Sequence, residues 1–168
     1  PISVLGWIGF GEAAYWIAEG LRDEGLSDIY AYDAYQDDAA LGPSIRQRAA
    51  KLEIGLQSSL RELIASSDVL INATNAKVAE TVAREAKSCL QPRHLYVDLN
   101  SAAPVTKEKI AALVAESGAS FVDAAVMDSV PPHKHRVPMF ISGTGAARFL
   151  EFGARYGMNL TLIGEQAG

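Results

Sequence analysis

The sequence of 168 residues has one cysteine, no long apolar run and no excess of basic side chains. Its single cysteine, Cys89, excludes an internal disulfide and any metal site built from several cysteines, and it favours a reducing compartment, the cytoplasm. The apolar runs are only a few residues long, so we expect no transmembrane helix and no membrane partner. The 20 acidic and 15 basic residues give a formal net charge of −5, which argues against nucleic acid as a partner.

The remaining composition is typical of a folded domain. Hydrophobic residues make up 49% of the chain and charged residues 21%, which argues against disorder. The length favours one domain spanning residues 1–168.

Short apolar runs alternate with amphipathic stretches along the chain. The pattern predicts strands at 2–8, 29–32, 52–56, 69–73, 95–99, 121–126, 138–141 and 159–163. Helices are predicted at 12–24, 44–51, 60–65, 78–90, 104–117 and 146–156. The stretch 69–73 is apolar on both faces, as buried parallel strands are. We therefore expect a Rossmann-type α/β fold, a doubly wound and mainly parallel sheet with helices on both faces.

A glycine-rich turn lies between the first predicted strand and the first predicted helix. Residues 9–14 read GFGEAA, which fits the dinucleotide-binding pattern G-x-G-x-x-G/A. Gly9 permits a tight turn, Gly11 lets the backbone approach a pyrophosphate, and Ala14 is small enough for helix-to-strand packing. The helix N-terminus adds N–H groups and a partial positive charge. We therefore expect a dinucleotide to be bound by Gly9, Phe10, Gly11, Glu12 and Ala13. The alternative is an ordinary strand followed by a glycine turn.

An acidic residue, Asp33, ends the second predicted strand 19 residues after Ala14 (33 − 14). The acid that accepts hydrogen bonds from an adenosine ribose is expected about 20 residues after such a turn. A carboxylate there also repels a 2′-phosphate, so NAD is favoured over NADP. Arg46 and Arg48 are close enough in the sequence to keep NADP possible. In the alternative interpretation, Asp33 is an ordinary loop acid.

Polar residues follow the fourth and fifth predicted strands. In a doubly wound sheet the ligand lies in the crevice at the carboxyl ends of the strands. We predict that Thr74 and Asn75 line the cofactor and that Asn100 and Ser101 lie near the nicotinamide. The alternative for Thr74 and Asn75 is plain turn chemistry. The alternative for Asn100 and Ser101 is helix capping ahead of Pro104, which is compatible with a binding role.

Other chemically suggestive residues favour structural interpretations. Asp98 and Asp123 lie at strand positions, and we expect them to accept hydrogen bonds from loop backbone rather than to act as an acid/base pair. His133 and His135 follow two prolines and have no third ligand nearby. We therefore predict a solvated loop at 133–136 and no metal site.

Three stretches together resemble one enzyme family. The sequence reads GWIGFG at 6–11, DLNSAAP at 98–104 and FVDAAV at 121–126. It is similar to the β-hydroxyacid dehydrogenase family, which includes 6-phosphogluconate and 3-hydroxyisobutyrate dehydrogenases, and it looks most like the NAD-binding type of 6-phosphogluconate dehydrogenase. The resemblance covers the whole chain as the N-terminal domain of such an enzyme.

The resemblance implies an oxidoreductase that transfers hydride between NAD(P) and a small 3-hydroxyacid. Asn100 and Ser101 occupy the family's serine and threonine positions, so the resemblance assigns them to positioning the substrate carboxylate or hydroxyl and the nicotinamide. The family's S-G-G substrate loop is replaced by residues 127–129, which implies a stiffer loop and a different substrate or loop path.

The resemblance also implies a part that this sequence does not contain. The family's proton-transfer lysine lies on the first long helix after this domain, and none of the six lysines matches that position. We expect the catalytic lysine a few residues beyond Gly168, on an all-helical domain that also forms a homodimer. Two alternatives stay open: an imine reductase-like enzyme, in which another residue replaces the lysine, and a non-catalytic dinucleotide-binding module.

Overall fold

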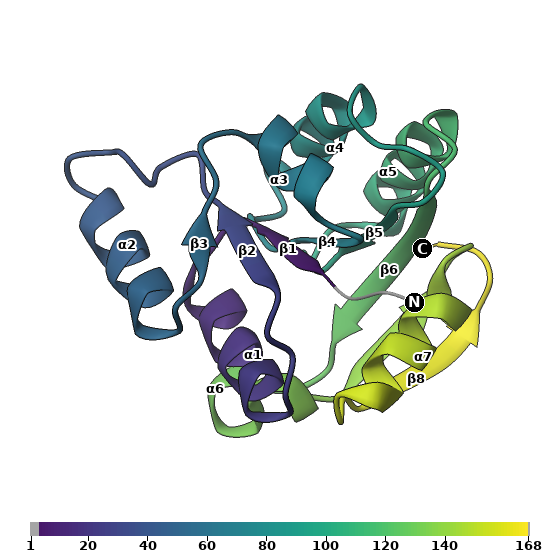
Figure 1. Ribbon diagram of the computed structural model, residues 1–168. Coiled ribbons are helices and arrows are strands. Elements are labelled where there is room, and N and C mark those ends of the chain that lie inside the picture. Colours follow the sequence, from purple (N-terminus) through teal and green to yellow (C-terminus); the bar gives the residue numbers. More distant parts are fainter. Residues whose placement is uncertain (1–3, 168) are drawn as a thin grey trace.

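The central strands are short apolar runs without an exposed face, and they lie in the interior for this reason. β1 (Leu5–Ile8), β4 (Val69–Asn72) and β5 (Leu95–Asp98) are buried along their whole length. The structure, a computed structural model, describes residues 4–167. Figure 1 shows the strands forming one sheet with helices on both of its faces.

The described strands form one sheet in the order β3-β2-β1-β4-β5-β6-β7-β8. The other strands are β2 (Ile29–Tyr32), β3 (Gly55–Leu56), β6 (Ser120–Val126), β7 (Met139–Ser142) and β8 (Leu160–Gly164). Neighbours pair in parallel from β3 through β6, β7 runs antiparallel to β6, and β8 runs parallel to β7. The predicted Rossmann-type α/β fold, doubly wound and mainly parallel, is confirmed.

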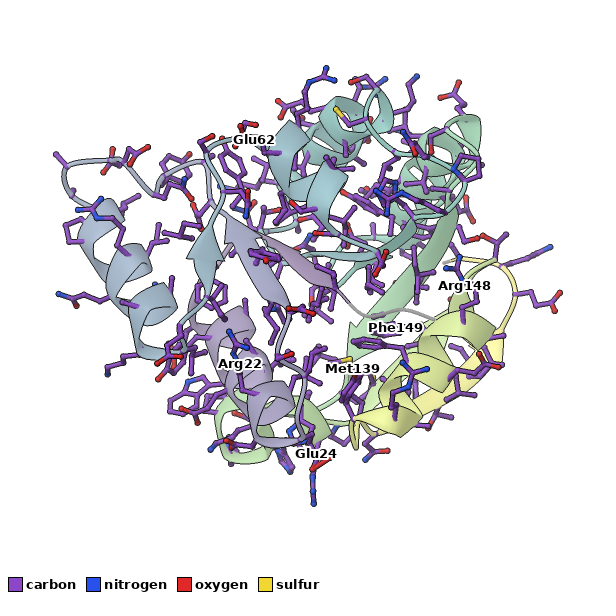
Figure 2. The ribbon with its side chains drawn as sticks, in the orientation of Figure 1. Arg22, Glu24, Glu62, Met139, Arg148 and Phe149 are labelled. Carbon is purple, nitrogen blue, oxygen red and sulfur yellow. The ribbon has the colours of Figure 1, made fainter. Side chains whose placement is uncertain are left out.

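The sheet separates the apolar core into two clusters, and helices cover one cluster on each face. α1 (Glu12–Asp23), α2 (Gly42–Lys51) and α7 (Ala146–Arg155) contribute to one cluster. α3 (Leu60–Ser66), α4 (Ala79–Lys87) and α5 (Pro104–Glu116) contribute to the other. Met139 of β7 and Phe149 of α7 belong to the first cluster, and Figure 2 shows them lying close together between the sheet and α7. No helix within residues 4–167 combines the length and apolarity needed to cross a membrane.

The first helix forms because its apolar residues recur at helical spacing and face the sheet. Ala14, Ile17 and Leu21 are buried on that face. The helix ends before Gly25, whose φ of +100° favours glycine. Arg22 in the last turn donates from Nε to the Leu52 carbonyl at 3.1 Å, which ties the end of α1 to the chain between α2 and β3.

Two predicted strands differ from the observed ones by more than one residue. β1 begins at Leu5, and the first residues of the predicted strand at 2–8 lie partly outside the described residues. The predicted strand at 52–56 is wrong for its first half, because Glu53 has a φ of +55° that no strand residue adopts. The backbone there turns after α2, and only Gly55 and Leu56 pair with β2.

One prediction concerns the carboxyl end of the sequence. Gly168, beyond which the resemblance places the catalytic lysine, lies outside the described residues. The six lysines within the sequence all lie before that position. The expected lysine beyond Gly168 therefore stays a prediction, and so does the helical domain that would carry it.

The predicted solvated loop at 133–136 is wrong. Residues Val130–His133 form the short helix α6, and Lys134–Arg136 form a 3-10 helix, η1. His135 is buried under α1, where Gly20 leaves room for its ring. Arg136 donates to the Glu24 carboxylate at 3.0 Å and fixes the segment at the end of α1. The sequence feature that indicates this packing is a glycine inside a helix, Gly20, which has no side chain to occupy the space of the ring.

Gly20→Ala should destabilise the fold, although alanine is the better helix former. A Cβ at this position would lie 2.0 Å from Nδ1 of His135, so the ring or the helix must move. We expect a loss of about 1–3 kcal/mol in the free energy of unfolding, measured by urea titration. In a His135→Ala background the same substitution should be neutral or stabilising. Equal destabilisation in both backgrounds would contradict the packing argument.

Stability should fall as the pH drops below about 6.5. Burial lowers the pKa of His94 and of His135 below the ordinary 6.5, so the unfolded chain binds protons at a higher pH than the folded one. The neutral ring of His94 accepts from Gln91 N at 2.9 Å, a bond that protonation would remove. Each histidine contributes a slope of at most about 1.4 kcal/mol per pH unit. Unfolding measured from pH 7.5 to pH 5 should show a weaker pH dependence in His94→Gln, whereas His133→Gln serves as the control.

Candidate functional site

The carboxyl ends of β1 and β4 lie side by side at the centre of the sheet. From β1 the chain passes through α1 to β2 on one side, whereas β4 pairs with β1 on the other side. The strand order therefore changes direction between β1 and β4, which is where open α/β sheets bind their ligands. One cavity opens at this point, and a second opens beyond the carboxyl end of β5.

Gly9 makes the bend that follows β1. Its φ of +86° favours glycine, and an added Cβ would lie 2.9 Å from the Ala73 carbonyl oxygen. Gly9 N also donates to the Tyr32 carbonyl at 2.8 Å. The bend is therefore wedged between the ends of β2 and β4, and both its conformation and its packing require glycine.

Gly11 has a different reason to be glycine. Its φ of −85° is open to every residue, and an added Cβ would have no protein atom within 4 Å. Neither the backbone nor the packing within the described chain requires glycine here. Gly11 is the N-cap of α1 and makes no side-chain cap, and the first helical bond runs from Tyr15 N to its carbonyl. The N–H groups of the first turn are thus left for an anion that approaches the bare backbone.

Asp33 connects the end of β2 to this turn. Its Oδ2 accepts from Phe10 N and its Oδ1 from Tyr35 N, each at 2.9 Å. A carboxylate oxygen has two lone-pair sites, so each oxygen keeps one acceptor site. Asp33 therefore does accept hydrogen bonds from loop backbone, and each of its oxygens can still accept another from a ribose hydroxyl.

The first cavity has a volume of about 370 Å³ and lies against these residues. Its polar lining comes from the glycine turn, from Asp33, from the residues after β4 and from α4: Gly9, Gly11, Asp33, Thr74, Asn75, Thr81 and Glu85. Its apolar lining includes Ile8, Leu60, Val78 and Val82. A bare backbone at a helix N-terminus, a carboxylate and an apolar slot together fit a dinucleotide.

Thr74 and Asn75, predicted to line the cofactor, line the first cavity, and both also show turn chemistry. Thr74 Oγ1 donates to Asn72 Oδ1 at 2.7 Å. Asn75 Oδ1 accepts from Lys77 N at 2.9 Å and from Val78 N at 3.2 Å just before α4. The turn interpretation is therefore confirmed, while the cofactor contact stays a prediction.

The second cavity has a volume of about 430 Å³ and contains the two predicted substrate-side residues, Asn100 and Ser101. The rest of its lining comes from the start of α5, from β6 and β7, and from Ile163: Ala102, Pro104, Lys107, Asp123, Ala124, Ala125, Val126, Phe140 and Ser142. The helix-capping alternative is wrong, because the N-cap of α5 is Ala103 and no side chain caps the helix.

A buried hydrogen-bond network joins the two cavities. Asn100 Nδ2 donates to Asn72 Oδ1 at 3.1 Å, the same oxygen that accepts from Thr74. Asn72 Nδ2 in turn donates to the Tyr96 hydroxyl at 3.0 Å. Burial raises the pKa of Tyr96, so this hydroxyl stays neutral. Residues of both cavities are therefore held by one set of side chains.

Sequence reasoning missed Lys107. The ammonium lies between two carboxylates, 3.0 Å from Asp98 Oδ1 and 2.7 Å from Asp123 Oδ1, and only 4% of the residue is exposed. Burial raises the pKa of Asp98, and Lys107 opposes that rise. The predicted backbone contact of Asp98 is confirmed, since Asn100 N donates to it at 2.9 Å. The available signal was spacing: Lys107 shares the buried helix stripe with Ile110 and Val114.

The other predicted residues are placed as follows. The Phe10 ring is buried in the core and its N–H donates to Asp33, whereas Glu12 and Ala13 are exposed in the first turn of α1. Arg46 donates to the Gln36 carbonyl and does not line the first cavity. Among residues 4–167, no three histidine, cysteine or acidic side chains lie together as metal ligands would.

Several similar proteins match nearly the whole chain. An uncharacterised 28.5 kDa protein of the 7S RNA 5′ region in Methanothermus fervidus is 26% identical over 98% of this chain and 59% of its own length. A conserved hypothetical protein from Sinorhizobium meliloti 1021 is 35% identical, with a TM-score of 0.93 over all of this chain and 56% of its own. A conserved protein of unknown function, described as structurally similar to 3-hydroxyacid dehydrogenases, is 30% identical, with a TM-score of 0.83 over 97% of this chain and 58% of its own. The chain thus spans somewhat more than half the length of these relatives.

More distant structures share the fold. A 3-hydroxyisobutyrate dehydrogenase from Mycobacterium tuberculosis is 16% identical, with a TM-score of 0.81 over 98% of this chain and 55% of its own. An imine reductase variant from Myxococcus stipitatus in complex with NAD+ is 20% identical, with a TM-score of 0.79 over 97% of this chain and 55% of its own.

Gly11→Ala should weaken NADH binding at least tenfold and change the free energy of unfolding by less than about 1 kcal/mol. The added methyl group meets no protein atom within 4 Å, but it occupies the approach to the helix N-terminus. NADH fluorescence titration and thermal unfolding measure the two effects. Gly164→Ala is the matched control, because a Cβ there is equally unobstructed and lies away from the first cavity. Unchanged NADH affinity in Gly11→Ala would contradict the assignment of this turn.

The family comparison agrees with the geometry of the turn and of Asp33. Residues 4–150 match the family described as the NAD binding domain of 6-phosphogluconate dehydrogenase. This match confirms the resemblance seen in the sequence and the predicted cofactor. The chain belongs to this family of NAD-binding domains.

Proposed function

We propose that this chain is the cofactor-binding part of an NAD-dependent oxidoreductase that acts on a small 3-hydroxyacid. The observation that carries the proposal is Gly11, a glycine that the protein's own backbone and packing do not require, at the uncapped N-terminus of α1 beside Asp33. When bound, the nicotinamide supplies the hydride transfer. The chain's residues bind the dinucleotide, orient it and hold the substrate against it.

On the cofactor side, the first-turn N–H groups of α1 bind the diphosphate, and Asp33 accepts hydrogen bonds from the adenosine ribose. NAD is favoured over NADP because the Asp33 carboxylate repels a 2′-phosphate and no arginine or lysine lines the first cavity within the described residues. Arg46, the nearest candidate in sequence for such a phosphate, is engaged by the Gln36 carbonyl at 2.6 Å. Thr74 and Asn75 line the first cavity at the end of β4.

On the substrate side, Asn100 and Ser101 line the second cavity. Asn100 shares its hydrogen bonds with Asn72, which also holds Thr74 of the first cavity. A substrate in contact with Asn100 is therefore held in a fixed position relative to the residues that line the cofactor cavity. This mutual positioning is what hydride transfer asks of the protein.

The complete enzyme includes more than residues 1–168 in this proposal. Following the family resemblance, a helical domain after Gly168 supplies the proton-transfer lysine and forms a homodimer. Lys107 does not replace that lysine, because both of its neighbouring carboxylates hold its ammonium.

Imine reduction is the second candidate function. It is supported by the polarity of the second cavity, which Asp123 and Asn100 line. Acceptor groups of this kind suit a protonated imine or amine as well as a hydroxyl group. The substrate assay therefore has to include both classes.

The full-length protein should bind NADH more tightly than NADPH and should reduce NAD with at least one member of a panel of 3-hydroxyacids, followed at the nicotinamide absorbance. Asn100→Ala should lower kcat/KM at least about tenfold, since it removes a hydrogen bond to the substrate. Ser58→Ala, at an exposed serine outside both cavities, is the control.

Each alternative gives its own result in this assay. Turnover of cyclic imines with NADH but of no hydroxyacid favours the imine reductase. Dinucleotide binding without any turnover favours a non-catalytic module. If neither dinucleotide binds, the proposed function is wrong, and tighter binding of NADPH would overturn the argument from Asp33.

A further inference from the structure

Lys107 is a buried cation at the wall of the second cavity, and all of its hydrogen-bonding capacity is used. Its ammonium lies 3.0 Å from Asp98 Oδ1 and 2.7 Å from Asp123 Oδ1, and it donates to the Asp98 carbonyl at 3.1 Å. An ammonium has three N–H donors, and these three oxygens account for them. Lys107 therefore has no donor left for a ligand in this arrangement, so its role lies in what it holds.

The group held by Lys107 in turn holds Asn100. Asp98 Oδ1 accepts from Asn100 N at 2.9 Å, and Asp98 Oδ2 lies 3.4 Å from Asn100 Nδ2. The Asn72 carbonyl and Oδ1 accept from the same Nδ2 at 3.3 and 3.1 Å. The nitrogen of the Asn100 amide thus faces three oxygen atoms that accept.

This surrounding fixes which way the Asn100 amide points. A flipped amide would place its oxygen against a carboxylate, a backbone carbonyl and the Asn72 side-chain oxygen, and none of these has a proton to donate. The orientation of the Asn72 amide is fixed in the same way, because Thr74 N donates to Asn72 Oδ1 at 3.2 Å and only the oxygen can accept. Asn100 Oδ1 has no hydrogen-bond partner among residues 4–167 and is not a fully buried atom, and Asn100 lines the cavity.

The charge of Lys107 supports the Asp98 part of this arrangement. Burial favours the protonated form of Asp98, and Lys107 opposes it. A protonated Asp98 would present an O–H donor, which would remove one of the three acceptors that face the Asn100 nitrogen and could bond to the amide oxygen of the flipped orientation. The ammonium favours the carboxylate form of Asp98, which accepts from the Asn100 nitrogen together with the two Asn72 oxygens.

We propose that Lys107 is a positioning residue that acts through Asp98 to hold the Asn100 amide oxygen toward the second cavity. The cavity then offers an acceptor at this point and takes a ligand group that donates a hydrogen bond, such as the hydroxyl of a 3-hydroxyacid. The identity of that ligand rests on the proposed function, whereas the orientation of Asn100 does not.

The test compares three changes in the full-length protein. Lys107→Met removes the cation, and the paired change Asp98→Asn with Lys107→Met removes the whole Lys107–Asp98 ion pair, so that the fully buried Asp98 carboxylate is not left without its cation. Lys109→Met is the matched control, because Lys109 is exposed on the same helix. With an oxidisable substrate, the first two should raise the substrate KM about tenfold and leave NADH affinity unchanged. The control should change neither.

A double-mutant cycle separates positioning from general loss of structure. If Lys107 acts through Asn100, Lys107→Met should not raise the substrate KM further in an Asn100→Ala background. Additive increases in the substrate KM, or a loss of NADH affinity that parallels the increase in the substrate KM, would overturn the proposal.

A second readout needs no substrate and so separates this inference from the proposed function. In NMR spectra, the side-chain NH₂ of Asn100, assigned by its loss in Asn100→Asp, should be protected from exchange with solvent in the wild type. Protection should be lost in Lys107→Met or, where that variant does not fold, in the paired variant. Retained protection in a folded variant would overturn the proposal, even if no dinucleotide bound and no substrate were found.

Discussion

The bend at Gly9 is the constraint on which both cavities depend. Its left-handed backbone lets β1 end against the Ala73 carbonyl that follows β4 and donate a hydrogen bond to the end of β2. Any side chain here would push these ends apart, and α1 would then leave the sheet in another direction. The helix N-terminus, Asp33 and the end of β4 converge because this one residue has no Cβ.

Polar side chains at the ends of β4 and β5 connect the first cavity to the second. Asn72 and Asp98 are fully buried, which is costly unless every polar atom finds a partner. Asn72 accepts hydrogen bonds from Thr74 and Asn100, and Asp98 is held by Asn100 and Lys107. All of these neighbours line one of the two cavities. A network of this kind specifies one arrangement, because a half-satisfied alternative would leave a carboxylate or an amide without partners.

Much of the fold could be predicted because its signals are local. The apolar run at β4, the helical spacing of Ala14, Ile17 and Leu21, and the glycines at 9 and 11 each fix structure within a few residues. Where the signal is a tertiary contact, prediction failed. His135 is buried because Gly20, more than 100 residues earlier, leaves it room, and the residues before Gly55 turn because Glu53 adopts a positive φ. The candidate site shows the same division: the glycine turn, Asp33 and Thr74 follow from motif and strand position, whereas Lys107 escaped because the pairing of β5 with β6 brings Asp98 and Asp123 to it.

Asp33 carries two duties that cannot be varied separately. Its carboxylate braces the Phe10 and Tyr35 amides while it also faces the first cavity. A lineage that exchanged this acid for a small neutral residue, to admit a phosphorylated ribose, would lose the brace together with the charge. A substitution of Asp33 that removes the charge would therefore need a compensating change elsewhere in the loop to hold the two amides.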